Sequence, residues 1–303
     1  MKNAKSVIFV LILGLVGLIL SRLLMGIEFS NAGRQIQSRG PVLRVITFNP
    51  AAAEAIYELG AQARLVGVSG FCSYPPDAAN KAQVGDSINP DYEKLRVLQP
   101  DLVIIMGKND KLTMFCNGIG ARVLRLDMYN IDGLLADIKI LGAELECSAR
   151  AASLCAKIEA ELAEVKAKVA GLERKKVFLS FFRSRDSLTE LSTAGGGTHL
   201  NNLVEIAGGE NIYRDLKLFY PTISKESLLK AAPDVIIEPR TADELAGDAQ
   251  QLYRKQWGLL GSLPAEKTGS IYFPDADLLL KPGPRVGQAA MVLARMIHPE
   301  IID

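Results

Sequence analysis

The chain has 303 residues, 49% of them hydrophobic and 23% charged, a composition typical of globular domains and not of disordered or collagen-like chains. Its 35 Lys and Arg residues nearly balance its 34 Asp and Glu residues, so no long-range positive field favours nucleic acid or an anionic membrane surface. The two histidines, His199 and His298, are too few for a zinc site built of several imidazoles.

The N-terminal segment predicts export from the cytoplasm. Lys2 and Lys5 precede an uncharged apolar run over residues 7–20, which is typical of a secretory signal. If Arg22 reaches the membrane surface, residues 7–27 are also long enough for a bilayer span, which needs roughly 20 residues. We therefore expect residues 1–32 to be a signal peptide or a membrane anchor, residues 33–41 to be a tether, and the protein to lie in the periplasm or on the outer face of the cytoplasmic membrane.

Strand-like and helical segments alternate along the rest of the chain. Strands are predicted over 43–48, 65–68, 102–106 and 123–126, with helices between them such as 51–59. This alternation predicts a parallel sheet covered by helices.

One long helix divides the alternating pattern into two parts. Between Ser148 and Gly171 apolar residues recur every three or four positions and charged residues fill the other face, which predicts an amphipathic helix of roughly 35 Å. We expect an N-terminal lobe over 42–147, an interlobe helix over 148–172 and a C-terminal lobe over 173–303.

The second part repeats the first in outline. Glu93 stands seven residues before Pro100-Asp101, and Glu226 stands seven residues before Pro233-Asp234; a β-branched run follows each pair. Because proline stops a helix and aspartate suits a turn, both segments read as helix, tight turn and buried strand. The repeat predicts two similar α/β lobes with a cleft between them.

The four cysteines leave two alternatives open. An oxidising compartment would allow two disulfide bridges among Cys72, Cys116, Cys147 and Cys155, but the spacing does not select partners. Four unpaired, mostly buried thiols are equally expected.

Signatures of catalysis are missing from the sequence. It contains no GxSxG elbow, no phosphate loop ending in GK[ST] and no HExxH. The segment Gly195 to Gly197, before Thr198, predicts either an anion-binding loop at a helix start or a plain turn with Thr198 as the N-cap. We therefore predict no enzyme activity, no cofactor and no metal held by the protein itself.

An ordered set of motifs carries a resemblance to a known family. The motifs are 44–50 with Glu54, 66–69 before 74–76, Glu93 before 100–103, 203–212, and 224–226 before 233–235. In this order the chain from 42 to 298 resembles the iron-siderophore and cobalamin substrate-binding proteins of ABC importers.

The resemblance implies a fold and a function. The expected fold is α/β, with two similar lobes that have parallel-sheet cores and are joined by a single long helix, the class III periplasmic binding protein architecture. The expected function is to capture a metal chelate, an iron-siderophore or a cobalamin-like corrinoid, and to deliver it to an importer permease and its ATPase. Glu93 and Glu226 match the family's docking glutamates. A monomer without nucleic acid is expected.

The resemblance also implies ligand contacts. Phe71 and Tyr220 match positions where cobalamin binders place rings against the corrin, whereas Asp86 and Ser87 stand where another binder has Trp. Charged side chains near the cleft would suit an anionic ferric chelate. The expected contacts are Phe71, Asp86, Lys108, Arg183, Arg185, His199, Tyr220, Asp277, Lys281 and Arg285.

Three alternatives compete with this reading. The same class of protein can bind haem, for which Tyr74 is a candidate iron ligand, although its place beside Pro75-Pro76 suggests a structural corner. A metal oxyanion such as molybdate could occupy the glycine-rich loop. From a different class, a chelate-processing enzyme would use Cys72 and Cys116 with a bound metal.

Overall fold

The computed structural model describes residues 41–184, 187–261 and 263–301. Residues 42–303 form one compact unit. The predicted signal or anchor and most of the predicted tether lie outside the described residues. Among the helices that are described, none has both the length and the apolar character that a membrane span requires.

The N-terminal lobe is built on a five-stranded sheet in the order β3-β2-β1-β4-β5, with every neighbouring pair parallel. Its strands are β1 (Val45–Thr47), β2 (Leu65–Val68), β3 (Ala82–Gln83), β4 (Leu102–Met106) and β5 (Arg122–Leu126). Its helices are α2 (Pro50–Glu58), α3 (Pro76–Ala79), α4 (Tyr92–Leu98), α5 (Asp110–Gly118) and α6 (Ile131–Glu144). The predicted parallel sheet is confirmed, although the first strand is shorter than the predicted range 43–48.

The C-terminal lobe contains a second sheet with the same central order. Strands β8-β6-β9-β10 are parallel neighbours, and β7 adds an antiparallel edge to β6. The strands are β6 (Lys175–Phe182), β7 (Ser192–Thr193), β8 (Gly209–Asn211), β9 (Val235–Ile237) and β10 (Ile271–Tyr272). The helices are α8 (His199–Ile206), α9 (Lys225–Ala231), α10 (Ala249–Gly258), α11 (Pro264–Thr268), α12 (Ala276–Leu279) and α13 (Val286–Ile297).

The Pro-Asp repeat of the sequence has the same structural role in both lobes. The Asp101 carboxylate accepts hydrogen bonds from the backbone N–H groups of Leu43 (2.9 Å) and Arg44 (2.8 Å), just before β1. The Asp234 carboxylate accepts one from the backbone N–H of Lys176 in β6, at 2.8 Å. Each aspartate thus ties the strand that it precedes to the start of the central strand of its sheet, which explains why the motif occurs twice.

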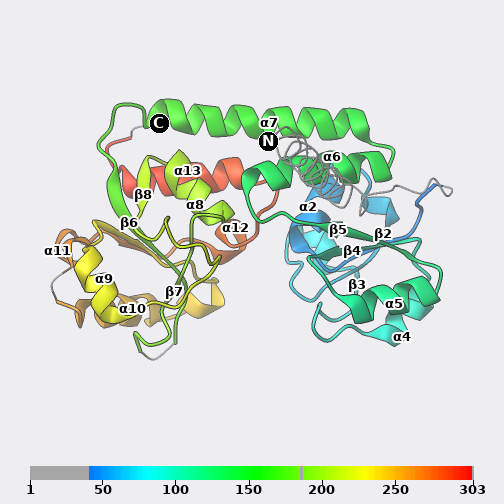
Figure 1. The fold of residues 1–303 in the computed structure, drawn as a ribbon, viewed down its shortest axis with the longest axis horizontal. Coiled ribbons are helices and arrows are strands. Elements are labelled where there is room, and N and C mark those ends of the chain that lie inside the picture. The colour runs from blue at the N-terminus through cyan, green and yellow to red at the C-terminus, as the bar shows by residue number, and fades with distance from the viewer. Residues whose placement is uncertain (1–40, 185–186, 262, 302–303) are drawn as a thin grey trace, which may run out of the picture. The chain divides into compact units, whose positions relative to one another are not determined.

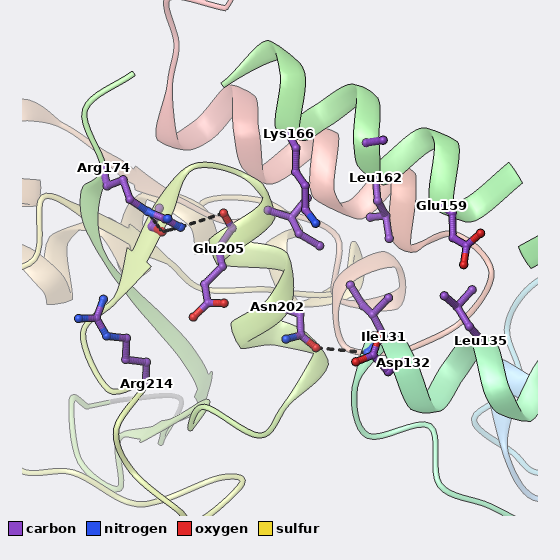
Figure 2. A pocket seen from close by; sticks show the side chains of 13 residues that line it. Ile131, Asp132, Leu135, Glu159, Leu162, Lys166, Arg174, Asn202, Glu205 and Arg214 are labelled. Atoms are coloured by element: carbon purple, nitrogen blue, oxygen red, sulfur yellow. Dashed lines mark hydrogen bonds between the residues drawn. The ribbon is translucent and has the colours of Figure 1, made fainter. Parts of the chain in front are cut away.

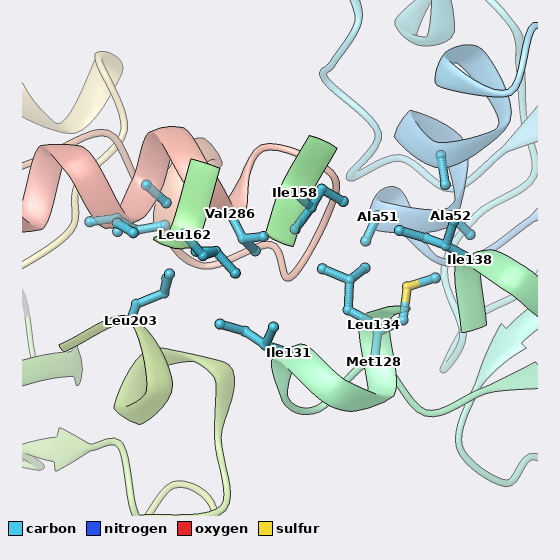
Figure 3. Packing of buried hydrophobic residues seen from close by; sticks show 14 of the residues in the cluster. Ala51, Ala52, Met128, Ile131, Leu134, Ile138, Ile158, Leu162, Leu203 and Val286 are labelled. Carbon is cyan, nitrogen blue, oxygen red and sulfur yellow. The ribbon is translucent and has the colours of Figure 1, made fainter. Parts of the chain in front are cut away.

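The predicted long helix is confirmed as α7 (Ser148–Lys168), which ends three residues before the predicted Gly171. It packs against α6 of the N-terminal lobe and α13 of the C-terminal lobe (Figure 1). Ile158 and Leu162 on its buried face join an apolar cluster that includes Ala51 of α2 and Leu203 of α8 (Figure 3). One continuous core therefore runs along α7 through both lobes.

Candidate functional site

Exposed aromatic side chains end or follow strands in both lobes. In open α/β sheets, ligands bind outside the carboxyl ends of the strands. In the N-terminal lobe, Phe71 (64% exposed) and the exposed Tyr74 follow β2. In the C-terminal lobe, Phe182 (59% exposed) ends β6, and the exposed Phe219 and Tyr220 follow β8 along the chain. We call these five residues the aromatic edge.

Ring contacts order the aromatic edge in the C-terminal lobe. Tyr220 stacks on Phe181, with ring centroids 4.0 Å apart and an interplanar angle of 23°. Phe219 stacks on Tyr129, which follows β5 of the other lobe, at 5.2 Å and 22°. Burial raises the pKa of Tyr220 to about 12, and the nearby Tyr129 adds to this rise, so the Tyr220 phenol is neutral at physiological pH.

A hollow of about 620 Å³ opens beside these rings. Its lining residues are Phe181, Phe182, Glu190, Ser192, Tyr220 and Thr222. Tyr220 was a predicted ligand contact, but Phe181, Phe182, Phe219 and Tyr129 were missed. The adjacent pair Phe181-Phe182 was an available signal, because adjacent aromatic residues of a strand cannot both face the core.

The structure brings Asp277 and Lys281 together with a residue of the other lobe. The Lys281 ammonium lies 2.6 Å from the Asp277 carboxylate and donates to the Ser73 hydroxyl, also at 2.6 Å. Ser73 in turn donates to Asp277. Burial opposes ionisation of Asp277, but the hydrogen bonds from Lys281 and Ser73 outweigh it, so the pKa of Asp277 is lowered.

Arg285 forms a second link between the lobes. Its guanidinium donates two hydrogen bonds to the Glu54 carboxylate of α2, at 2.9 and 2.7 Å, and lies 3.8 Å from the centroid of the Tyr74 ring. Burial raises the pKa of Glu54, and the Arg285 charge opposes this rise. We call Glu54, Ser73, Tyr74, Asp277, Lys281 and Arg285 the interlobe clasp.

Arg183 does not face a ligand. Its side chain is buried, its Nε donates to Glu238 at 2.8 Å, and its Nη1 donates to Gln256 at 2.8 Å. Trp257 donates to the other Glu238 oxygen. The expectation that Arg183 gives the cleft positive charge is therefore wrong, because a carboxylate far along the chain draws it into the core of the C-terminal lobe. Arg185 lies outside the described residues.

His199 is also buried, and the expectation that it faces the cleft is wrong. Its ring Nε2 donates to the backbone oxygen of Leu279 at 2.9 Å, while its Nδ1 has no partner. Its backbone N–H donates to the backbone oxygen of Tyr129 at 2.6 Å. Burial lowers the pKa of His199 to about 4, so the ring is a neutral part of the packing between the lobes.

The glycine-rich loop has no amides to offer to an anion at its start. The N–H groups of Gly195 and Gly196 donate to the backbone oxygens of Phe219 (2.8 Å) and Leu216 (3.3 Å). The Thr198 hydroxyl accepts from the backbone N–H of Asn201, at 3.2 Å. The Thr198 N-cap of the plain-turn alternative is therefore present, and two of the three glycine amides are already bonded within the protein.

Two other predicted contacts have local partners. The Asp86 carboxylate accepts from the backbone N–H groups of Ile88 and Asn89, both at 2.7 Å, which makes it a turn residue. Lys108 is exposed and pairs with Asp110 at 3.0 Å.

A second cavity is a separate feature. It measures about 800 Å³ and is lined by α6, α7, α8 and the segments around Arg174 and Gly209. Arg174 and Arg214 lie at one end, with Asp132 and Glu159 at the other (Figure 2). No predicted ligand contact lines it.

Thiols and metal ligands give no support to the chelate-processing enzyme. All four cysteines are unpaired, and burial raises the pKa of Cys116 to about 11 and also raises that of Cys72. Such thiols are poor nucleophiles because the reactive form is the thiolate. Within the described residues, His, Cys, Asp and Glu form no group of three or more that could hold a metal ion.

The described chain has two lobes with mainly parallel sheets and one shared apolar core, and exposed aromatic residues follow strands of both sheets. A comparison with protein families matches residues 45–278 to a family described as periplasmic binding protein. The chain belongs to this family, whose members are binding proteins and not enzymes.

Two curated relatives share more than a quarter of the aligned residues. The vitamin B12-binding protein of Salmonella typhi is 28% identical over 258 residues, which cover 84% of this chain and 90% of that protein. The cobalamin-binding protein of Halobacterium salinarum (strain ATCC 29341 / DSM 671 / R1) is 29% identical over 264 residues, covering 84% of this chain and 69% of that protein.

Solved structures share the fold. The periplasmic vitamin B12 binding protein BtuF of Vibrio cholerae superposes with a TM-score of 0.72 at 23% identity, covering 86% of this chain and 98% of that one. The periplasmic heme-binding protein BhuT, solved with two hemes, gives 0.75 at 25% identity, covering 87% and 100%. The predicted two-lobed, class III architecture is thereby confirmed.

Proposed function

We propose that this protein is the extracytoplasmic substrate-binding component of an ABC importer and that its substrate is a cobalamin-like corrinoid. The observation that carries the proposal is the aromatic edge, which presents Phe71 and Tyr74 from one lobe and Phe182 and Tyr220 from the other. Flat ring systems gain from contact with aromatic faces in addition to the burial of apolar area. The names of the relatives from Salmonella and Halobacterium support the same substrate class.

The charges near the aromatic edge favour a corrinoid over an anionic ferric siderophore. A ferric chelate of high negative charge would need cations without carboxylate partners. Each predicted cationic contact that the structure describes already has a carboxylate partner. The pairs are Lys108 with Asp110, Arg183 with Glu238, Lys281 with Asp277, and Arg285 with Glu54.

Haem is the second candidate, favoured by the likeness to BhuT. Haem iron usually takes an axial ligand from His, Tyr, Cys or Met. Both histidines are buried with ring nitrogens bonded to backbone oxygens, and burial raises the pKa of Tyr220 to about 12, which disfavours its phenolate. Tyr74, the iron ligand that the sequence suggested, is exposed and is the residue on which haem binding would depend. A cobalamin needs no ligand from the protein because it carries its own axial ligands on cobalt, whereas haem has none of its own.

We also propose that Glu93 and Glu226 dock the protein on the permease. Both are exposed and occupy the second position of seven-residue helices, α4 and α9. Both helices end in a residue with left-handed backbone, Gln99 and Ala232. Two carboxylates at equivalent places in the two lobes give a partner two fixed points of attachment, which specify orientation.

Titration of the purified protein with cyanocobalamin, by calorimetry and absorbance, tests the substrate. We expect saturable 1:1 binding, and about tenfold weaker binding for Tyr220→Ala, since a ring contact contributes ~0.5–1.5 kcal/mol beyond area burial and 1.4 kcal/mol is tenfold. Leu43→Ala, an exposed apolar site before β1, is the control and should bind normally. Binding of hemin, with a shifted Soret band, in the absence of cyanocobalamin binding would select haem instead.

A further inference from the structure

We propose that Arg285, held by Glu54, is a positioning residue that fixes the Tyr74 loop of one lobe from the other lobe. This inference rests on the proposed function, because Tyr74 belongs to the aromatic edge. Arg285 stands at the start of α13, 211 positions after Tyr74 in the chain, so the contact can form only when the two lobes are in place.

Glu54 cannot be left without Arg285. It is 3% exposed and lies in α2 between buried alanines. The chain just before Arg285 comes so close that a Cβ added to Gly283 would meet the Glu54 carboxylate at 3.2 Å. An unpaired carboxylate in such a place is strongly unfavourable, so the guanidinium has one well-defined position, held by two parallel hydrogen bonds.

The fixed guanidinium then restrains Tyr74. Its central carbon lies 3.8 Å from the ring centroid, within the range of a cation–π contact. Tyr74 is otherwise an exposed side chain, which would exchange among rotamers in solution. A ring that is already held in the substrate-free protein loses no rotamer freedom when the substrate binds, so binding carries a smaller entropic cost.

The other half of the clasp holds the neighbouring residue. Ser73 is bonded to Lys281 and Asp277, which come from the same stretch of the C-terminal lobe as Arg285. Two successive residues of the β2–α3 loop are therefore tied to one segment of the opposite lobe. The C-terminal lobe therefore fixes the position of residues in the substrate surface of the N-terminal lobe, and Arg285 does this without contacting the substrate.

Arg285→Lys tests the proposal because it keeps the charge beside Glu54 but loses the planar, two-point contact and the stacking. We expect cyanocobalamin binding to weaken 3- to 10-fold, with little change in melting temperature. Tyr74→Ala should weaken binding in the wild-type background and have a smaller effect in the Arg285→Lys background, as residues that act through each other do.

A matched control and a direct readout complete the design. Arg254→Lys changes another arginine whose guanidinium lies over an aromatic ring, Phe273 at 5.8 Å. Arg254 is not a member of the clasp, so this substitution should leave affinity unchanged. Fluorotyrosine labelling reports the environment of the Tyr74 ring directly by ¹⁹F NMR, and Tyr74→Phe assigns its resonance. In the substrate-free protein, Arg285→Lys should move this resonance toward that of an exposed tyrosine.

The outcomes separate this inference from the proposed function. Failure of the wild type to bind cyanocobalamin refutes the proposal that the substrate is a corrinoid, and the same variants are then titrated with hemin. If the protein binds neither compound, both proposals are overturned. An unchanged ¹⁹F resonance in Arg285→Lys, or additive effects of the Tyr74 and Arg285 substitutions, would overturn the positioning role even if cyanocobalamin binds.

Discussion

His199 makes the stability of the fold depend on pH in a calculable way. Its Nε2 donates to Leu279, so the proton of the neutral ring is on Nε2, and Nδ1 has no partner. Protonation of Nδ1 would create a buried N–H group without a hydrogen-bond acceptor and a buried positive charge. Burial accordingly lowers the pKa to about 4 from the model-peptide value of 6.5.

The sign of the effect follows from proton binding. Between pH 6.5 and 4 the unfolded chain holds a proton on this residue that the folded chain does not, so the free energy of unfolding falls as the pH is lowered through this window. From the two pKa values, the contribution of His199 at pH 5 is about 2 kcal/mol less favourable than at pH 7.5.

His199→Gln provides the comparison because glutamine keeps an N–H donor near the Nε2 position but does not titrate. Urea unfolding followed by circular dichroism, at pH 7.5 and pH 5 and equal ionic strength, measures the free energy of unfolding of both proteins. We expect the wild type to lose about 2 kcal/mol more than the variant between the two pH values. An equal loss in both proteins would refute the assignment of a buried, neutral His199.

Two further predictions concern residues with contrasting environments. Glu93→Gln combined with Glu226→Gln should leave the melting temperature and the cyanocobalamin affinity unchanged but reduce corrinoid uptake by cells that carry the native importer. The control Glu164→Gln, at an exposed site on α7, should leave uptake unchanged. Weaker cyanocobalamin binding by the double variant would place Glu93 and Glu226 in the substrate site instead. Arg183→Met should lower the free energy of unfolding by about 3 kcal/mol, because it removes one partner of a buried ion pair. The affinity for cyanocobalamin should not change. A loss of this affinity without a loss of stability would show that Arg183 does contact the substrate.

The fold was predictable because its signals are local. The 148–171 periodicity, the Pro-Asp turns and the β-branched runs each depend on residues a few positions apart. Arg183 and His199 were mispredicted because their surroundings are set by residues 55 and 80 positions away, Glu238 and Leu279. A charged or polar residue enters a core only when such a partner is present, and a single sequence does not show the pairing.

The aromatic edge is an intermediate case. The resemblance predicted Phe71 and Tyr220. Finding Phe182 required knowledge of where β6 ends, and finding Phe219 required its contact with the distant Tyr129. Strand ends are the least certain part of a sequence-based prediction, and a shift of one residue exchanges the buried and exposed side chains of a strand. The clasp was only partly predictable, since Glu54 belongs to a motif of the resemblance and Arg285 was an expected ligand contact, but nothing in the sequence pairs them.

The shared core along α7 has a consequence for how proteins of this shape diversify. Because Ile158 and Leu162 belong to a cluster that also holds side chains from α2 and α8, a change on this face of the helix disturbs the packing of two sheets at once. The loops that follow the strands carry no such double constraint. New cargo preferences are therefore expected to arise by exchange of loop side chains, while the interior on either side of the helix changes slowly and in concert.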